Sequence, residues 1–389
     1  MNKPFIWQSV SFSIRFIYVF FPLFFLTVIE YGNYSATIAV IYLFIAILDL
    51  GYSTILTRKL VDNSDSLSCA NDYWGAALAY SFFSFIIVCV LLYSYHNNLT
   101  QALIISFIFF IEFIFVFIKK GYSALGILSE GIALELYKNL ILLLCIVFAY
   151  LLFTDLNSNR IFLFLAIGCI LVFIYLFTSI FSRLRFKNFN FGIIFNFKRP
   201  AAIQAIYLTV IEMSIRIYSN QLDPEITALY SFYSIPLFSI YVIVWSSVGM
   251  SFYKDIMYLN PGSDNLNILF YSIHKLFLYA FLLSVPLILL NLILFKMEIL
   301  SFYTFFLPDL LFIYFLPFLI LLDSSLSQLL HAFHLDVYNS IISLAALTVF
   351  FIFIVVAMAP LEITKLFLSF YIAILCSIFL RLFAILIRK

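Results

Sequence analysis

Charged side chains are scarce in this sequence, and this scarcity sets the first limit on what the chain can be. Only 10% of its 389 residues are charged and 65% are hydrophobic, with a mean hydropathy of +1.14, whereas a soluble domain carries about 25% charged residues. A soluble core could not bury so much apolar surface. Since a spanning helix needs about 20 apolar residues, a chain of this length with short loops holds about twelve.

Cysteine, glycine and histidine are also few, at five, ten and four residues. The cysteines show no paired spacing, so neither a disulfide framework nor a metal knuckle is expected. The chain has no glycine-rich phosphate loop, no serine elbow and no pair of carboxylates on an external loop, which excludes an ATP-driven pump in a single chain. His331 and His334 have helical spacing but fall where a span leaves the membrane. We therefore expect no metal, no cofactor and no enzymatic activity.

Long apolar runs occupy nearly the whole chain, and we predict an all-α polytopic membrane protein. Helices are the default in lipid, because an unclosed strand leaves backbone groups unpaired. The predicted spans are 9–29, 36–57, 74–94, 101–118, 138–154 and 160–182 in the first half, then 200–219, 227–250, 269–295, 302–328, 338–358 and 362–386 in the second.

Positive charge collects in alternate connections between these spans. One set holds Lys3, Arg58, Lys59, Lys119, Lys120, Lys138, Arg183, Arg185, Lys187, Lys198, Arg199, Lys254, Arg388 and Lys389, while the opposite set holds only Arg160, Lys296 and Lys365. By the positive-inside rule both termini face the cytoplasm. We expect the protein to contact membrane lipids and not to bind nucleic acid.

A basic segment, 183–199, divides the chain into two predicted lobes of six helices, 1–182 and 200–389. Sliding the halves by 196 positions places Tyr34-Ser35 over Tyr230-Ser231 and Arg58 over Lys254. Six helices is an even number, so both lobes enter the membrane from the same side and form a parallel pseudo-twofold repeat about an axis along its normal. This layout is typical of a two-lobed transporter.

Ionisable residues inside spans cost about 2.5 to 3.5 kcal/mol each and are functional candidates. The sequence offers Arg15, Asp49, Glu112, Glu212, Arg216, Asp309 and Asp323. Arg15, Asp49 and Glu112 are predicted at similar depth, where they could share one polar pocket or form a structural ion cluster. Asp309 lies just inside the outward end of span ten, whereas Asp323 is expected near the cytoplasmic surface and hydrated.

Glu212 and Arg216 are four residues apart, on one face of span seven. One interpretation is a self-neutralised arginine. The other is a switch, in which protonation of Glu212 frees Arg216 for an anionic ligand. Several spans also contain prolines that kink helices, namely Pro22, Pro236, Pro286, Pro308 and Pro317.

Two stretches of the sequence resemble a known family. The run Glu30-Tyr31-Gly32-Asn33-Tyr34-Ser35, followed by Asp49-Leu50-Gly51-Tyr52 and Arg58-Lys59-Leu60, resembles the opening of polysaccharide flippases of the multidrug/oligosaccharidyl-lipid/polysaccharide (MOP) exporter superfamily. The second half repeats it with Glu212, Asp223-Pro224-Glu225 and Ala228-Leu229-Tyr230-Ser231. The chain is most similar to the Wzx-type O-antigen flippase group, although members often have an Asp-Arg pair where this chain has Glu212 and a displaced Arg216.

The resemblance implies two six-helix lobes in a V around a central cavity in the cytoplasmic (inner) membrane. It implies that undecaprenyl-pyrophosphate-linked oligosaccharide is moved to the outer leaflet by alternating access, with an H⁺ or Na⁺ gradient as the drive. Arg15 and Arg216 are the expected pyrophosphate contacts, because a guanidinium fork suits this group. Asp49, Glu112, Glu212 and Asp309 are the expected ion-coupling or cavity residues. A polysaccharide polymerase and a chain-length regulator are the implied protein partners.

Two other interpretations stay open. An O-antigen polymerase or other membrane glycosyltransferase is equally hydrophobic, but such enzymes resemble one another in carrying a sizeable outward loop, which this sequence lacks. A small-molecule exporter of the same superfamily shares the predicted fold, and the loose motifs do not exclude it.

Overall fold

The computed structural model describes residues 10–11, 14, 17, 20–49, 52–53, 67–125, 128–153, 156–179, 201–245, 265–296, 307–332, 335–356 and 362–387. All regular secondary structure in these residues is helical. The chain divides into two compact units, Met1–Arg199 and Pro200–Lys389, and each is described by itself.

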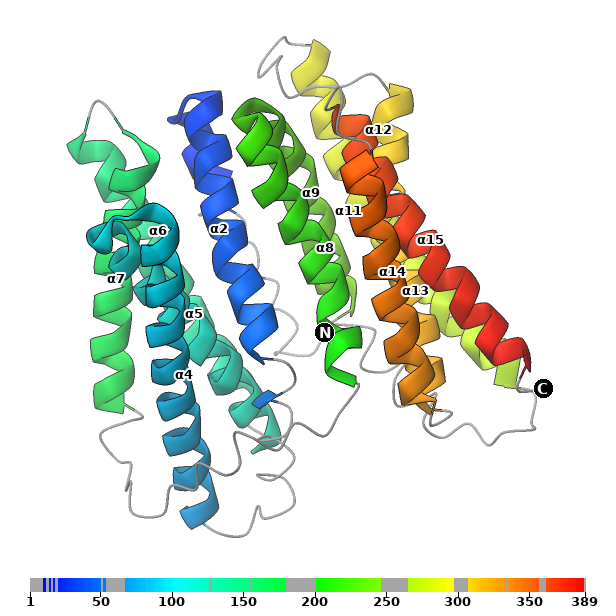
Figure 1. The fold of residues 1–389 in the computed structure, drawn as a ribbon, viewed down its shortest axis with the longest axis horizontal. Helices are drawn as coiled ribbons and strands as arrows, with labels where there is room; N and C mark the ends of the chain where they lie inside the picture. The colour runs from blue at the N-terminus through cyan, green and yellow to red at the C-terminus, as the bar shows by residue number, and fades with distance from the viewer. Residues whose placement is uncertain are drawn as a thin grey trace. The chain divides into compact units, whose positions relative to one another are not determined.

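In the first part of unit 1 the structure describes residues 10, 11, 14, 17 and 20, which are helical. The elements that follow are η1 (Phe21–Phe24), α2 (Val28–Asp49), α4 (Leu67–His96), α5 (Leu99–Ala124), α6 (Leu128–Leu152) and α7 (Ser158–Ser179). α5 packs against α2, α4, α6 and α7, as Figure 1 shows, and its centre is the most deeply buried part of the unit. Phe109, Phe113 and Phe117 form a ring column along it, with successive centroids 5.3 Å apart.

Unit 2 contains α8 (Ala201–Leu222), α9 (Pro224–Val244), α11 (Asn265–Lys296), α12 (Leu307–Tyr314), α13 (Leu316–Ala332), α14 (Asp336–Val356) and α15 (Ile363–Ile387). α13 is its most buried helix, in contact with α9, α11, α14 and α15. α12 and α13 follow one another with only Phe315 between them. We call them together the interrupted helix.

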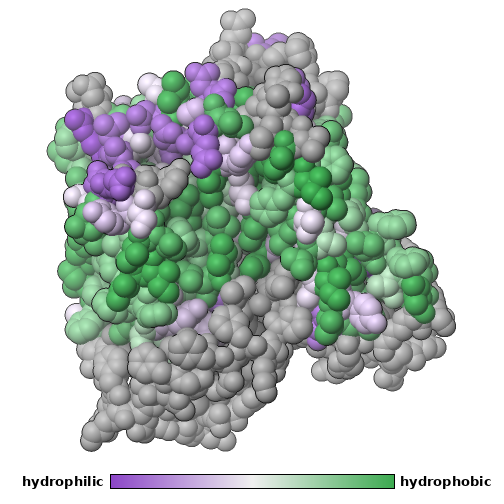
Figure 2. Space-filling model, in the orientation of Figure 1, coloured by the Kyte–Doolittle hydropathy of each residue, from purple (hydrophilic) through white to green (hydrophobic). Residues whose placement is uncertain are grey.

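Nine helices among the described residues are long and apolar enough to cross a membrane. Large apolar side chains lie exposed along the helices, including Leu151, Phe281 and Phe379, as expected where helices contact lipid. On the face drawn in Figure 2, hydrophobic residues cover the middle of the unit 1 helices and hydrophilic residues gather at one end.

Two short turns between described helices are fixed by local chemistry. Asn97 turns the chain between α4 and α5 with a positive φ of 51°, a conformation that asparagine tolerates better than most residues. Asn98 then accepts a hydrogen bond from the Gln101 N–H at 3.2 Å and caps α5. Asp223 caps α9 through the Glu225 N–H at 2.9 Å, with Pro224 in the first helical turn.

Several predicted boundaries are wrong. The predicted connection 119–137 is helical over most of its length, because α5 continues to Ala124 and α6 begins at Leu128. Lys138, counted as a loop charge, is buried in α6. α2 begins at Val28 rather than at residue 36, so the run Glu30 to Ser35 is helical. These shifts have one cause: polar side chains at the predicted loop positions are paired inside the bundle, and hydropathy alone does not register a pair.

Candidate functional site

Buried charges are the chemically significant feature of both units. Among the described residues, three ion pairs lie almost entirely out of solvent: Glu112–Lys138, which we call the α5–α6 pair; Glu212–Arg216, the α8 pair; and Asp323–Arg381, the α13–α15 pair. Each charge in a span carries a free-energy cost that must be offset by its partner or by function. The geometry of each pair therefore decides which role it has.

The α8 pair lies on a single helix near its middle. Glu212 is about 16 Å along α8 at 1.5 Å per residue, and Arg216 follows one turn later. An Arg216 terminal nitrogen donates to Glu212 Oε1. The glutamate is fully buried and the arginine is 4% exposed. As the i,i+4 spacing predicts, the two residues neutralise each other without help from another helix.

Side chains of α9 surround this pair. Ser234 lies beside the Glu212 carboxylate, and Tyr230 lies within electrostatic range of both charges. Nearby, Ser219 of α8 and Thr227 of α9 share a hydrogen bond of 2.7 Å that joins the two helices. Among the described residues, Arg216 Nε has no hydrogen-bond partner. The guanidinium therefore keeps capacity to donate to a further group.

The α5–α6 pair joins two helices. Lys138 Nζ donates to both carboxylate oxygens of Glu112, at 2.8 and 2.7 Å, and lies 4.8 Å from the centroid of the Phe115 ring. The adjacent Asn139 donates its amide to the Ser11 carbonyl at 3.2 Å and hydroxyl at 3.1 Å. Because both carboxylate oxygens already accept from the ammonium, this arrangement has the form of a structural contact between helices.

The α13–α15 pair is the most extensively hydrogen-bonded. Besides the Asp323 carboxylate, Arg381 donates to the Asp323 carbonyl at 2.9 Å and to side chains of α14, with Asn339 Oδ1 and Ser343 Oγ both at 3.0 Å. Its planar group also lies near the ring of Tyr207 on α8. Arg381 thus connects four helices, and little of its donor capacity is left for a ligand.

The prediction that Asp323 is hydrated near the cytoplasmic surface is therefore wrong. Its side chain is about 1% exposed, because Arg381 reaches it from α15. The arginine was overlooked among the candidate ionisable residues. The sequence did contain a sign of this ion pair, because an arginine inside an apolar run requires an acidic partner on a neighbouring helix.

Asp49 and Glu112 do not share a pocket. Asp49 accepts from the Ser53 N–H and hydroxyl at 2.9 and 2.8 Å, and its carboxylate lies 3.5 Å from Lys120 Nζ. Lys120 is eight residues beyond Glu112 on α5, or about 12 Å along the helix. Asp49 thus lies near the end of α5, in a partly exposed contact.

Two predicted site residues cannot be placed. Arg15 lies outside the described residues, and Asp309 falls in α12 but its side chain is outside them. In the part of the chain that the structure describes, no group of three or more His, Cys, Asp or Glu residues could hold a metal ion. Of the predicted residues that can be placed, only Glu212 and Arg216 come together, and Arg216 keeps a free donor. The α8 pair is therefore the best candidate site.

Comparison with known proteins identifies the fold. No family model and no curated protein sequence matches the chain, but several solved structures do. The lipid II flippase MurJ, in an inward closed conformation, aligns with a TM-score of 0.61 and 16% identity, covering 98% of this chain and 86% of its own. An outward-facing multidrug resistance MATE family transporter of the MOP superfamily gives 0.57 and 12%, covering 98% and 92%. An inward-facing MATE family transporter gives 0.60 and 12%, covering 97% and 93%.

At these identities the likeness establishes the fold. The chain has the fold of MOP superfamily transporters, which the MATE transporters and the MurJ flippase share, over almost its entire length. The polysaccharide flippases that the sequence resembles belong to the same superfamily.

Proposed function

We propose that this protein is a flippase of the inner membrane that moves an undecaprenyl-pyrophosphate-linked oligosaccharide to the outer leaflet. The observation that supports the proposal most is the fold, since 98% of the chain aligns with a lipid II flippase. The motif Glu30 to Ser35 adds the resemblance to polysaccharide flippases. A surface-polysaccharide repeat unit such as an O-antigen is the proposed cargo.

Alternating access is the proposed mode of transport. Transporters with this fold have outward-facing and inward-facing conformations. The two units of this chain also correspond in detail: α2 begins at Val28 and α9 at Pro224, which are equivalent positions of the repeat. Two similar bundles that enter the membrane from the same side suit a transporter in which one bundle moves against the other.

The α8 pair has the proposed switching role. In this conformation Arg216 is buried and one of its terminal nitrogens is occupied by Glu212, so only part of its guanidinium is available to a substrate. Protonation or cation binding at Glu212 releases Arg216, which then holds a pyrophosphate through a charge-assisted, two-pronged contact. The groups that face Glu212 are Arg216 of its own helix and Tyr230 and Ser234 of α9. An H⁺ or Na⁺ gradient is therefore the proposed drive.

The direct test is a flipping assay in proteoliposomes. A fluorescent undecaprenyl-pyrophosphate oligosaccharide is placed in the inner leaflet, and its arrival outside is followed with a sugar-binding lectin at several pH values. We expect transfer by the native protein, loss of transfer with Arg216→Ala and with Arg15→Ala, and partial transfer with Arg216→Lys. Lys296→Ala, an exposed lysine at the end of α11, is the matched control and should transfer normally.

The same assay separates the roles within the pair. Glu212→Gln should keep transfer but remove its dependence on pH or on sodium, because the carboxylate can no longer change charge. Transfer by Glu212→Gln with an unchanged pH profile contradicts the switch and leaves the flippase assignment intact. Absence of transfer by folded native protein contradicts the flippase assignment itself.

A small-molecule exporter is the second candidate, favoured by the MATE transporters among the structural matches. Under this alternative the proteoliposomes extrude a cationic dye and leave the lipid-linked sugar in place. The polymerase alternative has no such support, because the matched structures are transporters and a flippase. Joined repeat units among the assay products would support the polymerase alternative.

A further inference from the structure

The interrupted helix has a defined break at Phe315. The Phe315 N–H donates to the carbonyls of Leu311 at 3.1 Å and Phe312 at 3.3 Å, and the Phe318 N–H donates back only three residues, to Phe315, at 3.1 Å. Pro317 lies within this turn, has no N–H and crowds the preceding turn. The helix is interrupted at Phe315, and we call residues 312–318 around this interruption the break.

Proline alone does not explain the break. α9 continues through Pro236 and α11 through Pro286 without interruption. What distinguishes the break is a side chain from another helix. The Tyr371 hydroxyl of α15 donates to the Phe312 carbonyl, and carbonyls near a break need such outside donors in lipid. The two rings also stack, with centroids 4.5 Å apart and planes 20° apart.

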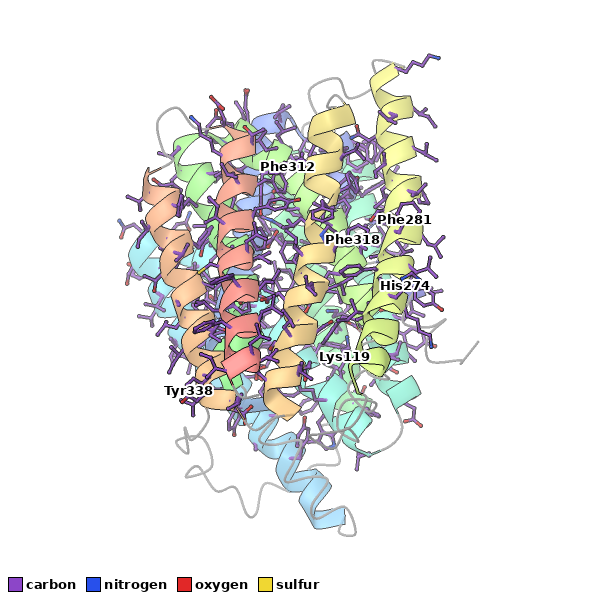
Figure 3. The ribbon with its side chains drawn as sticks, turned by 90° about the vertical axis from the view of Figure 1, so that its right-hand side faces the viewer. Lys119, His274, Phe281, Phe312, Phe318 and Tyr338 are labelled. Atoms are coloured by element: carbon purple, nitrogen blue, oxygen red, sulfur yellow. The ribbon has the colours of Figure 1, made fainter. Side chains whose placement is uncertain are left out.

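α15 therefore contacts both sides of the break. Tyr371 holds α12 through Phe312, and ten residues later Arg381 holds α13 through Asp323. Figure 3 shows the interrupted helix running beside α15, with Phe312 and Phe318 at the two ends of the break. A straight helix attached on both sides of a break limits how far the two segments can rotate about it.

The two attachments differ greatly in extent. Arg381 adds to its ion pair three hydrogen bonds of about 3.0 Å, and Leu316, Ile320 and Leu321 of α13 are fully buried. Among the described side chains, α15 reaches α12 through one hydrogen bond and one ring stack. Leu311 is 53% exposed and Phe312 38% exposed, whereas Ile313 and Tyr314 are buried. A neutral hydrogen bond is worth less than a buried charge-assisted one. Of the two segments, α12 is thus the one more weakly attached to α15, and its other neighbour is α11.

We propose that the break is a hinge: α12 pivots about Phe315 when the Tyr371–Phe312 contact opens, while α13 stays fixed to α15 through Arg381. The Tyr371–Phe312 contact then acts as a latch on α12, the mobile part of the interrupted helix, while α13 does not move. This hinge goes beyond the proposed function, because the inference does not depend on which substrate the protein moves.

The test measures distances between spin labels in the full-length protein, reconstituted in lipid nanodiscs with its native cysteines replaced by alanine. One label pair joins Leu311 on α12 to Leu344 on α14, both exposed. A second pair joins Gln328 on α13 to the same Leu344 and reports the fixed side. Tyr371→Phe keeps the ring stack and removes only the donated hydrogen bond.

The hinge predicts that Tyr371→Phe at least doubles the width of the Leu311–Leu344 distance distribution and leaves the Gln328–Leu344 distribution unchanged. Pro317→Ala restores an N–H to the helix, so adding it to Tyr371→Phe should return the first distribution to its native width. Phe312→Ala, which removes the stack alone, should broaden the same pair and provides a second route should Tyr371→Phe fail to fold.

Other outcomes overturn the proposal. Equal broadening of both label pairs indicates general loosening of the unit rather than a hinge. Native widths in both Tyr371→Phe and Phe312→Ala show that the contact is not a latch. Persistent broadening in the double variant with Pro317→Ala shows that the motion does not depend on the break.

Discussion

The α5–α6 pair and the α8 pair place a glutamate in comparable surroundings with opposite consequences. Each glutamate lies within electrostatic range of a buried tyrosine, Tyr34 for Glu112 and Tyr230 for Glu212, and the two tyrosines occupy equivalent positions of the repeat. In unit 1 the partner cation comes from another helix, whereas in unit 2 it comes from the same helix. A cross-helix pair cannot open without freeing two helices, but a same-helix pair can.

The first turns of α2 and α9 repeat this contrast. Thr27 accepts from the Glu30 N–H at 3.3 Å, and at the equivalent position of unit 2 Asp223 accepts from the Glu225 N–H at 2.9 Å. In unit 1, however, the Glu30 carboxylate also reaches α7 and accepts from the Ser158 N–H at 2.9 Å. Unit 1 thus again uses an acid to connect helices. The difference indicates that unit 1 is held more rigidly at these points.

The largest expected effect comes from the α13–α15 pair. Arg381→Met leaves Asp323 buried without a cation, and removing one partner of a buried pair costs about 3–5 kcal/mol. We expect a loss of this size in the free energy of unfolding, measured by denaturant titration in detergent. Adding Asp323→Asn should recover most of it, and equal instability of the single and double variants would contradict a role through charge.

A smaller loss is expected from Lys138→Met. Its ammonium connects two helices where Arg381 connects four, so we expect about 3 kcal/mol, at the lower end of the range for buried pairs. Glu112→Gln combined with Lys138→Met should restore most of that stability. A loss larger than that of Arg381→Met in the same titration would reverse the ranking of the two contacts.

Glu212→Gln tests the same-helix case. The glutamine oxygen still accepts from Arg216 and no helix loses its neighbour, so we expect about 1–2 kcal/mol. Both this variant and Lys138→Met remove one charge from a buried pair, the anion in the first case and the cation in the second. If Glu212→Gln destabilised the protein as much as Lys138→Met, the distinction between cross-helix and same-helix pairs would fail.

The smallest effect is expected at Glu30. Glu30→Ala removes the acceptor at the first turn of α7, and such caps contribute about 1 kcal/mol. Glu30→Gln keeps an acceptor but loses the charge, so its loss should be about half as large. Thermal unfolding of the two variants beside the native protein measures both. No change in either would show that Glu30 does not stabilise α7.

Local signals explain which features could be predicted from the sequence. The contact between Glu212 and Arg216 follows from i,i+4 spacing on one helix, so it was correctly predicted, as was the all-helical class. Lys138 and Arg381 instead have their partners on other helices, far away in the sequence. Their roles depend on which helices are neighbours, and no local pattern contains that information.

Prolines show the same limit. Pro236, Pro286 and Pro317 are equal as local signals, yet only Pro317 coincides with an interruption. The difference is Tyr371, which supplies a donor to the break from a distant part of the sequence. A proline therefore marks where a helix can be interrupted, and the tertiary neighbours decide whether it is.

α4 and α11 are unusually long, at 30 and 32 residues, and would extend about 45 and 48 Å. The hydrocarbon core of a bilayer is only about 30 Å thick. Each helix is thus about 15 to 18 Å longer than this core, so that about three turns of a helix that stands upright project from the hydrocarbon. Because a helix is stiff, a displacement of these turns is transmitted directly to the membrane-spanning part of the helix. A partner that binds them in the aqueous phase, or a change in bilayer thickness, could cause such a displacement.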